Sequence, residues 1–175
     1  MKHLLLLAFL TLAIGCSKTS DLQPGQTHQV QSPALKKAAN VTFTSTGVHV
    51  GNDIYDGTFS VSGLINGTGT SQEAVAITIP SSGNPQAMMN ATYTFHSTQT
   101  FTLDNNGGSI TVATAGTWAF SDPTLLHATG TGTWNIISST GSYAGLHGNG
   151  TLNITSIDFT GATTVADQYT GYIHF

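Results

Sequence analysis

The chain has 175 residues, of which 39% are hydrophobic and only 7% are charged, against roughly 25% charged in an average soluble domain. It contains no arginine, its four lysines all precede residue 40, and seven of its eight acidic residues follow residue 41. Because nucleic-acid binding needs cations that displace counterions from phosphates, this distribution excludes nucleic acid as a partner and disfavours phosphorylated ligands.

The first sixteen residues predict export. Lys2 is followed by an apolar run of about twelve residues, which is too short to span a bilayer and is typical of a secretory signal. The run ends directly before Cys16, the only cysteine. This arrangement resembles the lipobox of bacterial lipoproteins, with Ala13 where that family usually has leucine. The resemblance implies a signal peptide over residues 1–15, lipid attachment at Cys16 and stable membrane anchoring.

Residues 16–40 predict an acylated cysteine followed by a flexible tether. The segment has no sustained apolar periodicity and contains Pro24, Gly25, Pro33 and several glutamines, which is the composition of a solvated linker. Ser17, directly after the cysteine, favours the outer membrane as the location of the anchor. The alternatives are an ordinary signal peptide with an incidental cysteine and a buried cysteine in a cytosolic protein. We place a single domain over residues 41–175.

The domain has the alternating pattern of β-strands. Between residues 90 and 104, apolar side chains such as Tyr93, Phe95 and Phe101 alternate with threonines, which predicts a half-buried antiparallel strand. No segment after residue 41 shows a convincing helical period. We expect about eight strands, at residues 41–50, 57–66, 68–79, 90–103, 109–120, 128–138, 149–160 and 168–175. Eight such strands close naturally into an all-β, up-and-down antiparallel barrel, which has no exposed edge.

Glycine-rich segments at residues 63–73, 130–137 and 141–150 carry a resemblance to a known family. The last two give a Gly-Thr-Trp sequence, a turn and the string Gly-Ser-Tyr-Ala-Gly-Leu-His-Gly-Asn-Gly. Together they resemble small bacterial barrels of the allene oxide cyclase-like group, over about residues 58–154. Cyclases and dirigent proteins on this barrel bind apolar small molecules, so the resemblance implies a cavity. The catalytic residues of the cyclases find no matching motif here.

Glu73 is the only glutamate in the chain and the only candidate catalytic residue. In the strand expected at 68–79 it shares one face with Val75, Ile77 and Ile79, so we expect it to point into the barrel. A carboxyl group among aliphatic side chains has a raised pKa and can act as a general acid or as a ligand anchor. The alternative is a solvated residue at the rim of the barrel.

The remaining candidates are polar or aromatic side chains on the faces expected to point inward. Alternating glycines there leave volume that either tryptophans or a ligand would fill. A few polar groups on an apolar wall are typical of a binding pocket. The predicted ligand-binding set is Glu73, Tyr93, Gln99, Trp118, Trp134 and Tyr169.

No metal or cofactor is expected. His49, His96, His127, His147 and His174 lie on five separate segments without the pairing that a zinc site needs, and His96 and His174 are expected to face outward. The chain has no nucleophile elbow and no phosphate-binding loop.

These observations favour an outer-membrane lipoprotein, anchored through Cys16, whose barrel binds a small, largely apolar ligand without catalysis. The alternatives are a cyclase- or isomerase-type enzyme acting in the cavity and a coat module with a packed interior. An outer-membrane barrel is a further alternative because the chain ends on Phe175. The sequence specifies neither the ligand nor the oligomeric state.

Overall fold

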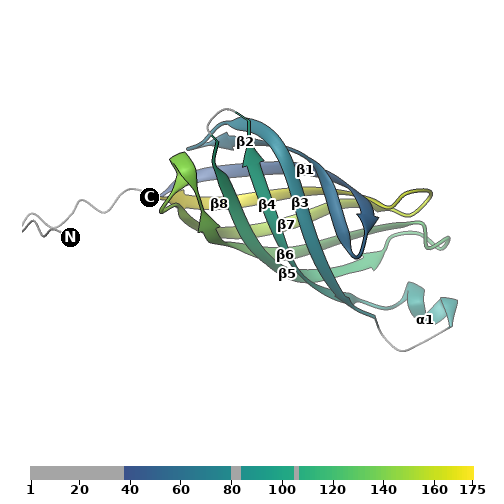
Figure 1. Ribbon diagram of the computed structural model, residues 1–175. Coiled ribbons are helices and arrows are strands. Elements are labelled where there is room, and N and C mark those ends of the chain that lie inside the picture. Colours follow the sequence, from purple (N-terminus) through teal and green to yellow (C-terminus); the bar gives the residue numbers. More distant parts are fainter. Residues whose placement is uncertain (1–37, 80–83, 105–106) are drawn as a thin grey trace, which may run out of the picture. The chain divides into compact units, whose positions relative to one another are not determined.

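A computed structural model describes residues 38–79, 84–104 and 107–175 and shows one closed barrel of eight antiparallel strands (Figure 1). The strands follow chain order around the barrel, and pairing of the last strand with the first closes it. This confirms the predicted fold class. The strands are β1 (Ala39–Gly51), β2 (Ile54–Gly63), β3 (Gly67–Thr78), β4 (Tyr93–Leu103), β5 (Ser109–Phe120), β6 (His127–Ser139), β7 (His147–Asp158) and β8 (Thr164–His174).

The N-terminal predictions fall largely outside this part of the chain. The signal peptide over residues 1–15, Cys16 and the tether as far as residue 37 lie outside the described residues. β1 begins at Ala39, slightly before the expected domain boundary at residue 41. Within the described residues, no helix has the length and apolar character that a membrane crossing requires.

Residues that alternate between apolar and polar in the sequence of β4 alternate between buried and exposed positions in the structure. In β4 every odd-numbered residue is buried, whereas the even-numbered threonines and His96 lie on the outer face. Threonine is favoured in strands because its branched side chain packs well on a pleated surface, and pairs on neighbouring strands can also form hydrogen bonds. The hydroxyls of Thr100 and Thr111 lie 3.1 Å apart, and those of Thr151 and Thr170 lie 3.0 Å apart.

A tight hairpin turn joins β1 to β2, and a register shift interrupts the regular pairing of β7. The β1–β2 connection is a two-residue turn in which Asn52 and Asp53 both have positive φ, as a type I′ hairpin turn requires. A register shift between Ile154 and Ser156 in β7 lets both Ile154 and Ile157 be buried although their numbers differ in parity.

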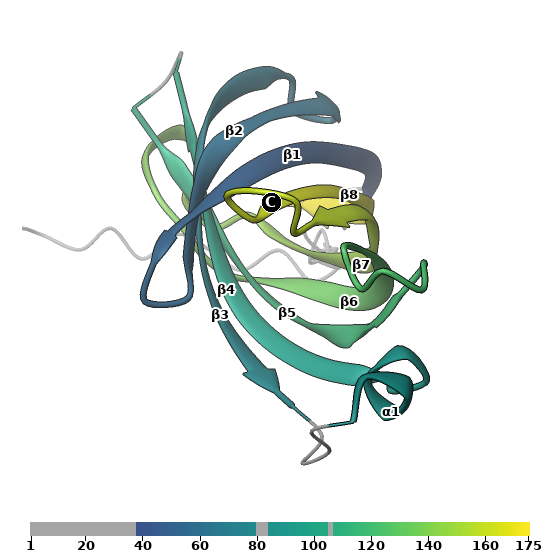
Figure 2. The same ribbon diagram turned by 90° about the vertical axis from the view of Figure 1, so that its right-hand side faces the viewer.

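The barrel has two different ends. One carries α1 (Pro85–Met89) in the β3–β4 connection, and Figure 2 views the barrel from this α1 end. The other carries η1 (Gly141–Tyr143) and the start of β1, because Ala39 pairs with Ile173 near the end of the chain. The helix α1 was not expected, since a single turn is too short to show a 3.6-residue period. Asn84 caps it by accepting a hydrogen bond from the backbone N–H of Gln86 at 3.0 Å.

An aromatic plug fills the interior from its middle towards the η1 end. The rings of Phe43 and Phe101 stack with centroids 4.9 Å apart, and Phe59 lies 4.8 Å from Phe101. Trp134 packs edge-on to Phe43, and its indole Nε1 donates to the carbonyls of Thr151 and Thr170. We define the plug by Phe43, Phe59, Phe101, Trp134 and Tyr169, all of which are buried.

Glycines make room for these rings. A Cβ atom on Gly171 would lie 2.1 Å from the carbonyl oxygen of Asn149 and 2.8 Å from Cζ2 of Trp134. One on Gly69 would lie 1.9 Å from the carbonyl oxygen of Thr102 and 2.8 Å from Cε1 of Phe59. These glycines therefore let the neighbouring strand and an aromatic ring approach closely. This half of the barrel interior is occupied by packing, so a ligand site inside the barrel would lie nearer the α1 end.

Candidate functional site

A self-contained polar group lies against the plug. The hydroxyl of Tyr169 donates to Oε1 of Gln99, and Nε2 of Gln99 donates to Oγ of Ser45 at 3.0 Å. These three side chains are at most 2% exposed. Because each satisfies another, they can be buried without the cost of an unpaired polar group.

Glu73 belongs to a second polar group, nearer the α1 end. Its carboxylate accepts a hydrogen bond from Oγ of Ser97 at 2.5 Å, and the same hydroxyl lies 2.5 Å from Oγ1 of Thr114. The three residues come from β3, β4 and β5, which are neighbours in the barrel, and all point inward. Glu73 is 7% exposed, as its position in the alternation predicted.

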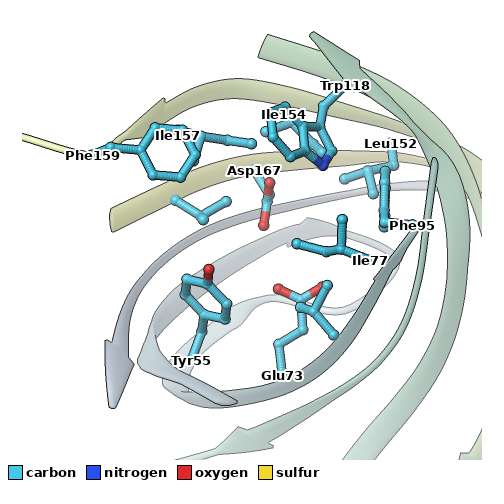
Figure 3. A pocket seen from close by; sticks show the side chains of 12 residues that line it. Tyr55, Glu73, Ile77, Phe95, Trp118, Leu152, Ile154, Ile157, Phe159 and Asp167 are labelled. Carbon is cyan, nitrogen blue, oxygen red and sulfur yellow. The ribbon is translucent and has the colours of Figure 1, made fainter. Parts of the chain in front are cut away.

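Glu73 also lines a pocket of about 60 Å³ towards the α1 end (Figure 3). Aliphatic and aromatic side chains form most of its wall, and three polar side chains interrupt it. Figure 3 shows the carboxyl groups of Glu73 and Asp167 and the hydroxyl of Tyr55 directed into the same space. The lining residues are Tyr55, Glu73, Val75, Ile77, Phe95, Trp118, Leu152, Ile154, Ile157, Phe159, Val165 and Asp167.

Asp167 is the least satisfied group in this pocket. It is 5% exposed, and its Oδ1 atom is buried without a hydrogen-bond partner. Burial raises the pKa of Asp167 well above its ordinary value, and the negative charge of Glu73 raises it further. A buried polar atom without a partner is uncommon in proteins and calls for an explanation.

The other titratable groups respond to the same surroundings. Burial raises the pKa of Glu73, and the hydrogen bond from Ser97 partly offsets this by stabilising the anion. Burial also raises the pKa of Tyr55, with smaller contributions from the charges of Glu73 and Asp53. The pKa of Tyr169 is raised by burial and by the nearby Asp167 and Glu73. The described residues include no lysine or arginine that could neutralise the two acids.

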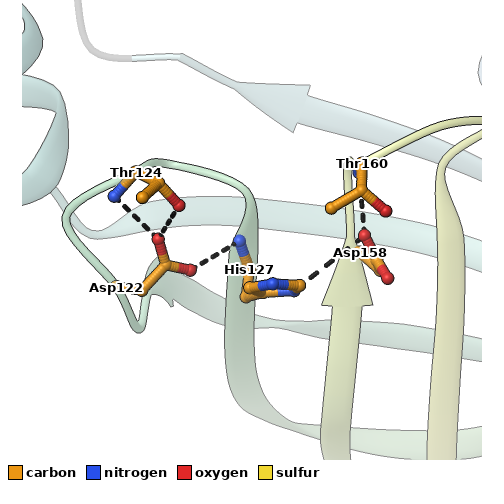
Figure 4. Close-up of polar contacts among 5 residues, drawn as sticks. All are labelled: Asp122, Thr124, His127, Asp158 and Thr160. Atoms are coloured by element: carbon orange, nitrogen blue, oxygen red, sulfur yellow. Dashed lines mark hydrogen bonds and ion pairs between the residues drawn. The ribbon is translucent and has the colours of Figure 1, made fainter.

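Two connections at the α1 end are held by acidic side chains (Figure 4). Asp122, in the β5–β6 connection, accepts hydrogen bonds from the backbone N–H groups of Thr124 at 2.7 Å and His127 at 2.9 Å. Asp158, at the end of β7, accepts from the backbone N–H of Thr160 at 2.8 Å and lies 3.9 Å from Nδ1 of His127. The Thr124 hydroxyl, which also donates to Asp122, and the backbone N–H bonds lower the pKa of Asp122. The hydrogen bonds from Thr160 lower the pKa of Asp158, so both aspartates are fixed negative charges near the pocket.

The structure places the predicted site residues in three different surroundings. Glu73 and Trp118 line the pocket, whereas Tyr93 lies behind it and stacks on Trp118 with centroids 4.2 Å apart. Gln99, Trp134 and Tyr169 were expected to contact ligand, but the structure places them in the polar group and the plug, outside the pocket lining. Their inward orientation is used for packing.

Sequence reasoning missed Asp167 and Tyr55. The expected strands began at residues 168 and 57, just after these side chains, whereas β8 begins at Thr164 and β2 at Ile54. Asp167 has the same parity as the buried Tyr169 and Ile173, so extending the alternation by one step would have found it. His96 and His174 are exposed, and among the described residues no group of three potential metal ligands lies together.

Removing the Tyr169 hydroxyl tests whether it has a structural role. We expect Tyr169→Phe to lower the free energy of unfolding by about 1–3 kcal/mol, because the buried Oε1 of Gln99 loses its donor. Tyr172→Phe on the same strand is the matched control, since Tyr172 is 61% exposed and should change stability by less than about 0.5 kcal/mol. Urea unfolding measures both. Equal effects in the two variants would contradict the structural role.

No family model, curated protein or solved structure matches this chain. What the pocket can do therefore follows from its own side chains. Two carboxyl groups in an apolar pocket can bind a hydrogen-bond donor or a cation, and a carboxyl group with a raised pKa can also transfer a proton.

Proposed function

We propose that this protein is a lipid-anchored protein of a bacterial outer membrane whose barrel binds a small, largely apolar ligand at the α1 end. The supporting observation is the pocket itself, an apolar cavity into which a few polar groups converge. Binding sites for small molecules generally combine these two features. The resemblance of residues 1–16 to a lipoprotein signal supports the anchor.

The dimensions of the pocket limit what can enter. A volume of about 60 Å³ is smaller than the ~150 Å³ of an apolar protein cavity that holds benzene. Ile77, which lines the pocket, is 42% exposed, so the pocket continues into an apolar rim at the α1 end. A ligand would therefore insert a small group and leave the rest of its apolar body against this rim.

The path of the chain is compatible with such access. Ala39, at the start of β1, pairs with Ile173 at the η1 end. A tether from Cys16 would therefore join the barrel at the end opposite the pocket. Detergent extraction tests the anchor: if Cys16 carries the lipid, Cys16→Ala should be released from membranes without detergent, whereas continued need for detergent would contradict lipid anchoring.

Native mass spectrometry of the protein purified from its own host tests ligand binding. We expect a bound small molecule that is released by collisional activation. The protein should appear without any bound molecule if the barrel is instead a packed coat module. A second preparation, in which the pocket is blocked, shows whether the molecule occupies this site.

Val75→Phe provides the blocked pocket. Val75 is half-buried and lines the pocket beside Glu73, so a phenyl ring there should occupy the cavity and abolish retention of the ligand. Ala76→Phe is the matched control, because Ala76 is the next residue of β3 and its side chain lies on the outer face. Ligand retained by Val75→Phe, or lost equally from both variants, would contradict binding in this pocket.

A cyclase or isomerase reaction in the same pocket is the second candidate. It is favoured by the burial of Glu73 and Asp167, because a carboxyl group with a raised pKa remains protonated closer to neutral pH and can donate a proton. The retained molecule distinguishes the two functions. Its conversion to an isomer by the unchanged protein, and not by Glu73→Gln, would establish catalysis, whereas unchanged ligand would support binding alone.

A further inference from the structure

We propose that the ligand is a small organic cation, an ammonium group on an apolar body, held by the carboxylates of Asp167 and Glu73. This inference rests on the proposed function of the pocket and specifies the chemistry of its occupant. Three separate observations support it: an unpartnered acceptor, the absence of an internal cation, and the placement of acidic residues along the barrel.

The unpartnered acceptor is Oδ1 of Asp167. Asp167 is only 5% exposed, and its Oδ1 is buried without a hydrogen-bond partner. The side chain lines the pocket, and Figure 3 shows its carboxyl group directed into the cavity. An ammonium group carries three hydrogen-bond donors and no acceptor. It could donate to Oδ1 of Asp167 and also to the carboxylate of Glu73, which already accepts a hydrogen bond from the Ser97 hydroxyl.

The absence of an internal cation separates this pair from an ordinary buried ion pair. Glu73 and Asp167 face one apolar space, and no lysine or arginine occurs among the described residues. Burying carboxylates without a partner of opposite charge is strongly unfavourable. A cationic ligand would supply the missing partner. The rings of Phe95, Trp118 and Phe159 border the same space, and aromatic faces also attract cations.

The acidic residues of the barrel are concentrated towards the pocket. Of the seven in the described chain, two are in the pocket, four lie on strands or connections near the α1 end, and one lies in the β4–β5 connection at the η1 end. Negative charge around an apolar opening raises the local concentration of cations. The residues are, in this order, Glu73 and Asp167; Asp53, Asp56, Asp122 and Asp158; and Asp104.

Three probes of four carbon atoms each test the charge preference. n-Butylamine is a cation at neutral pH, like the lysine side chain with its pKa of about 10.4; n-butanol is neutral, and butyrate is an anion. The full chain with Cys16→Ala, which lacks the predicted lipid-attachment site, is titrated with each probe by NMR. The indole N–H of Trp118 and the methyl groups of Val75 and Val165 report on the pocket.

We expect n-butylamine to shift these signals with a Kd at least about tenfold lower than that of n-butanol, because hydrogen bonds to a carboxylate from a charged donor are stronger than those from a neutral one. Butyrate should bind most weakly. Asp167→Asn and Glu73→Gln should each remove most of the preference for the amine. Asp104→Asn removes one acidic charge at the opposite, η1 end and should preserve the preference.

The pH dependence gives an independent readout. The affinity for n-butylamine should rise as pH rises through the titration of the carboxyl pair, and the affinity for n-butanol should not. The titratable groups that face the pair are Tyr55 from β2 and Tyr169 from β8, and both have raised pKa values. No histidine of the described chain lines the pocket, so a histidine titration would not produce this dependence.

The outcomes separate this inference from the proposed function. Equal affinity for the amine and the alcohol, or an amine preference that survives in both Asp167→Asn and Glu73→Gln, would overturn the cation proposal and leave a pocket for neutral ligands. If none of the three probes shifts the signals of the pocket, both the cation proposal and ligand binding at this site are contradicted.

Discussion

Trp134→Ala is expected to lower the free energy of unfolding by about 3–5 kcal/mol, which is the range for removing a fully buried aromatic side chain. Trp134 is 2% exposed, packs against Phe43 and Tyr169, and donates its indole N–H to the carbonyls of two neighbouring strands. Its loss would leave a void in the plug, far from the opening at the α1 end. Chemical denaturation followed by circular dichroism measures the change.

Trp118→Ala is the matched control. Trp118 is also buried, but it lines the pocket, so solvent or a neighbouring side chain can enter the space it leaves. The cost of such truncations depends on how well the site can relax, and we therefore expect a clearly smaller loss than for Trp134. If Trp118→Ala destabilises the protein as much as Trp134→Ala, the division of the interior into a packed plug and a pocket is wrong.

The second large effect is a change in the pH dependence of stability. Burial and the charge of Glu73 raise the folded-state pKa of Asp167. The native state therefore binds more protons than the unfolded state once pH exceeds the ordinary carboxyl range. The contribution of Asp167 is fully present below its unfolded pKa of about 3.9 and is lost as pH rises through the folded pKa, by about 1.4 kcal/mol for each pKa unit between the two states.

Asp167→Asn should weaken this dependence. Between about pH 4 and pH 8 the unchanged protein should lose stability through Glu73 and Asp167, while Asp167→Asn should lose distinctly less. The remaining groups titrate alike in both proteins, so the difference between the two curves isolates the contribution of Asp167 and its coupling to Glu73. Asp104→Asn, at an exposed residue directly after β4, is the control and should follow the unchanged protein. Parallel curves for Asp167→Asn and the unchanged protein would show that Asp167 is not a buried acid.

Strand parity explains why so much of this fold was predictable. A strand that buries one face must alternate, and a shift of one residue would exchange its two faces, so the pattern specifies which side chains point inward. This rule correctly placed Glu73 inside the barrel and His96 and His174 outside. The same rule placed Gln99, Trp134 and Tyr169 inside, where they lie.

Parity does not specify the depth of a side chain along the barrel axis. That depth depends on strand register, tilt and bulges, such as the register shift near Ile154, which involve residues far apart in sequence. Gln99 and Tyr169 were therefore assigned to a ligand site although they meet each other against the plug. Asp167 was missed for a related reason, because strand ends are the least certain part of a sequence pattern and the expected strand began one residue after it.

The barrel interior is divided into a packed plug and a pocket, so stability and ligand binding depend on different side chains. The plug and the hydrogen bonds among Tyr169, Gln99 and Ser45 hold the strands together without any ligand. The pocket can therefore keep an unsatisfied carboxyl group whose burial costs stability. Groups of this kind are typical of functional sites, where local stability is given up for binding or chemistry.

The most direct measurement is a titration of the carboxyl carbons of Glu73 and Asp167 by ¹³C NMR in the full chain. A buried pair in an apolar pocket predicts that both groups titrate above the ordinary values of about 4.3 for glutamate and 3.9 for aspartate, with Asp167 clearly displaced because burial and the charge of Glu73 both raise its pKa. Midpoints at those ordinary values for both groups would mean that the carboxyls are solvated, and would contradict the carboxyl pair on which the proposed site depends.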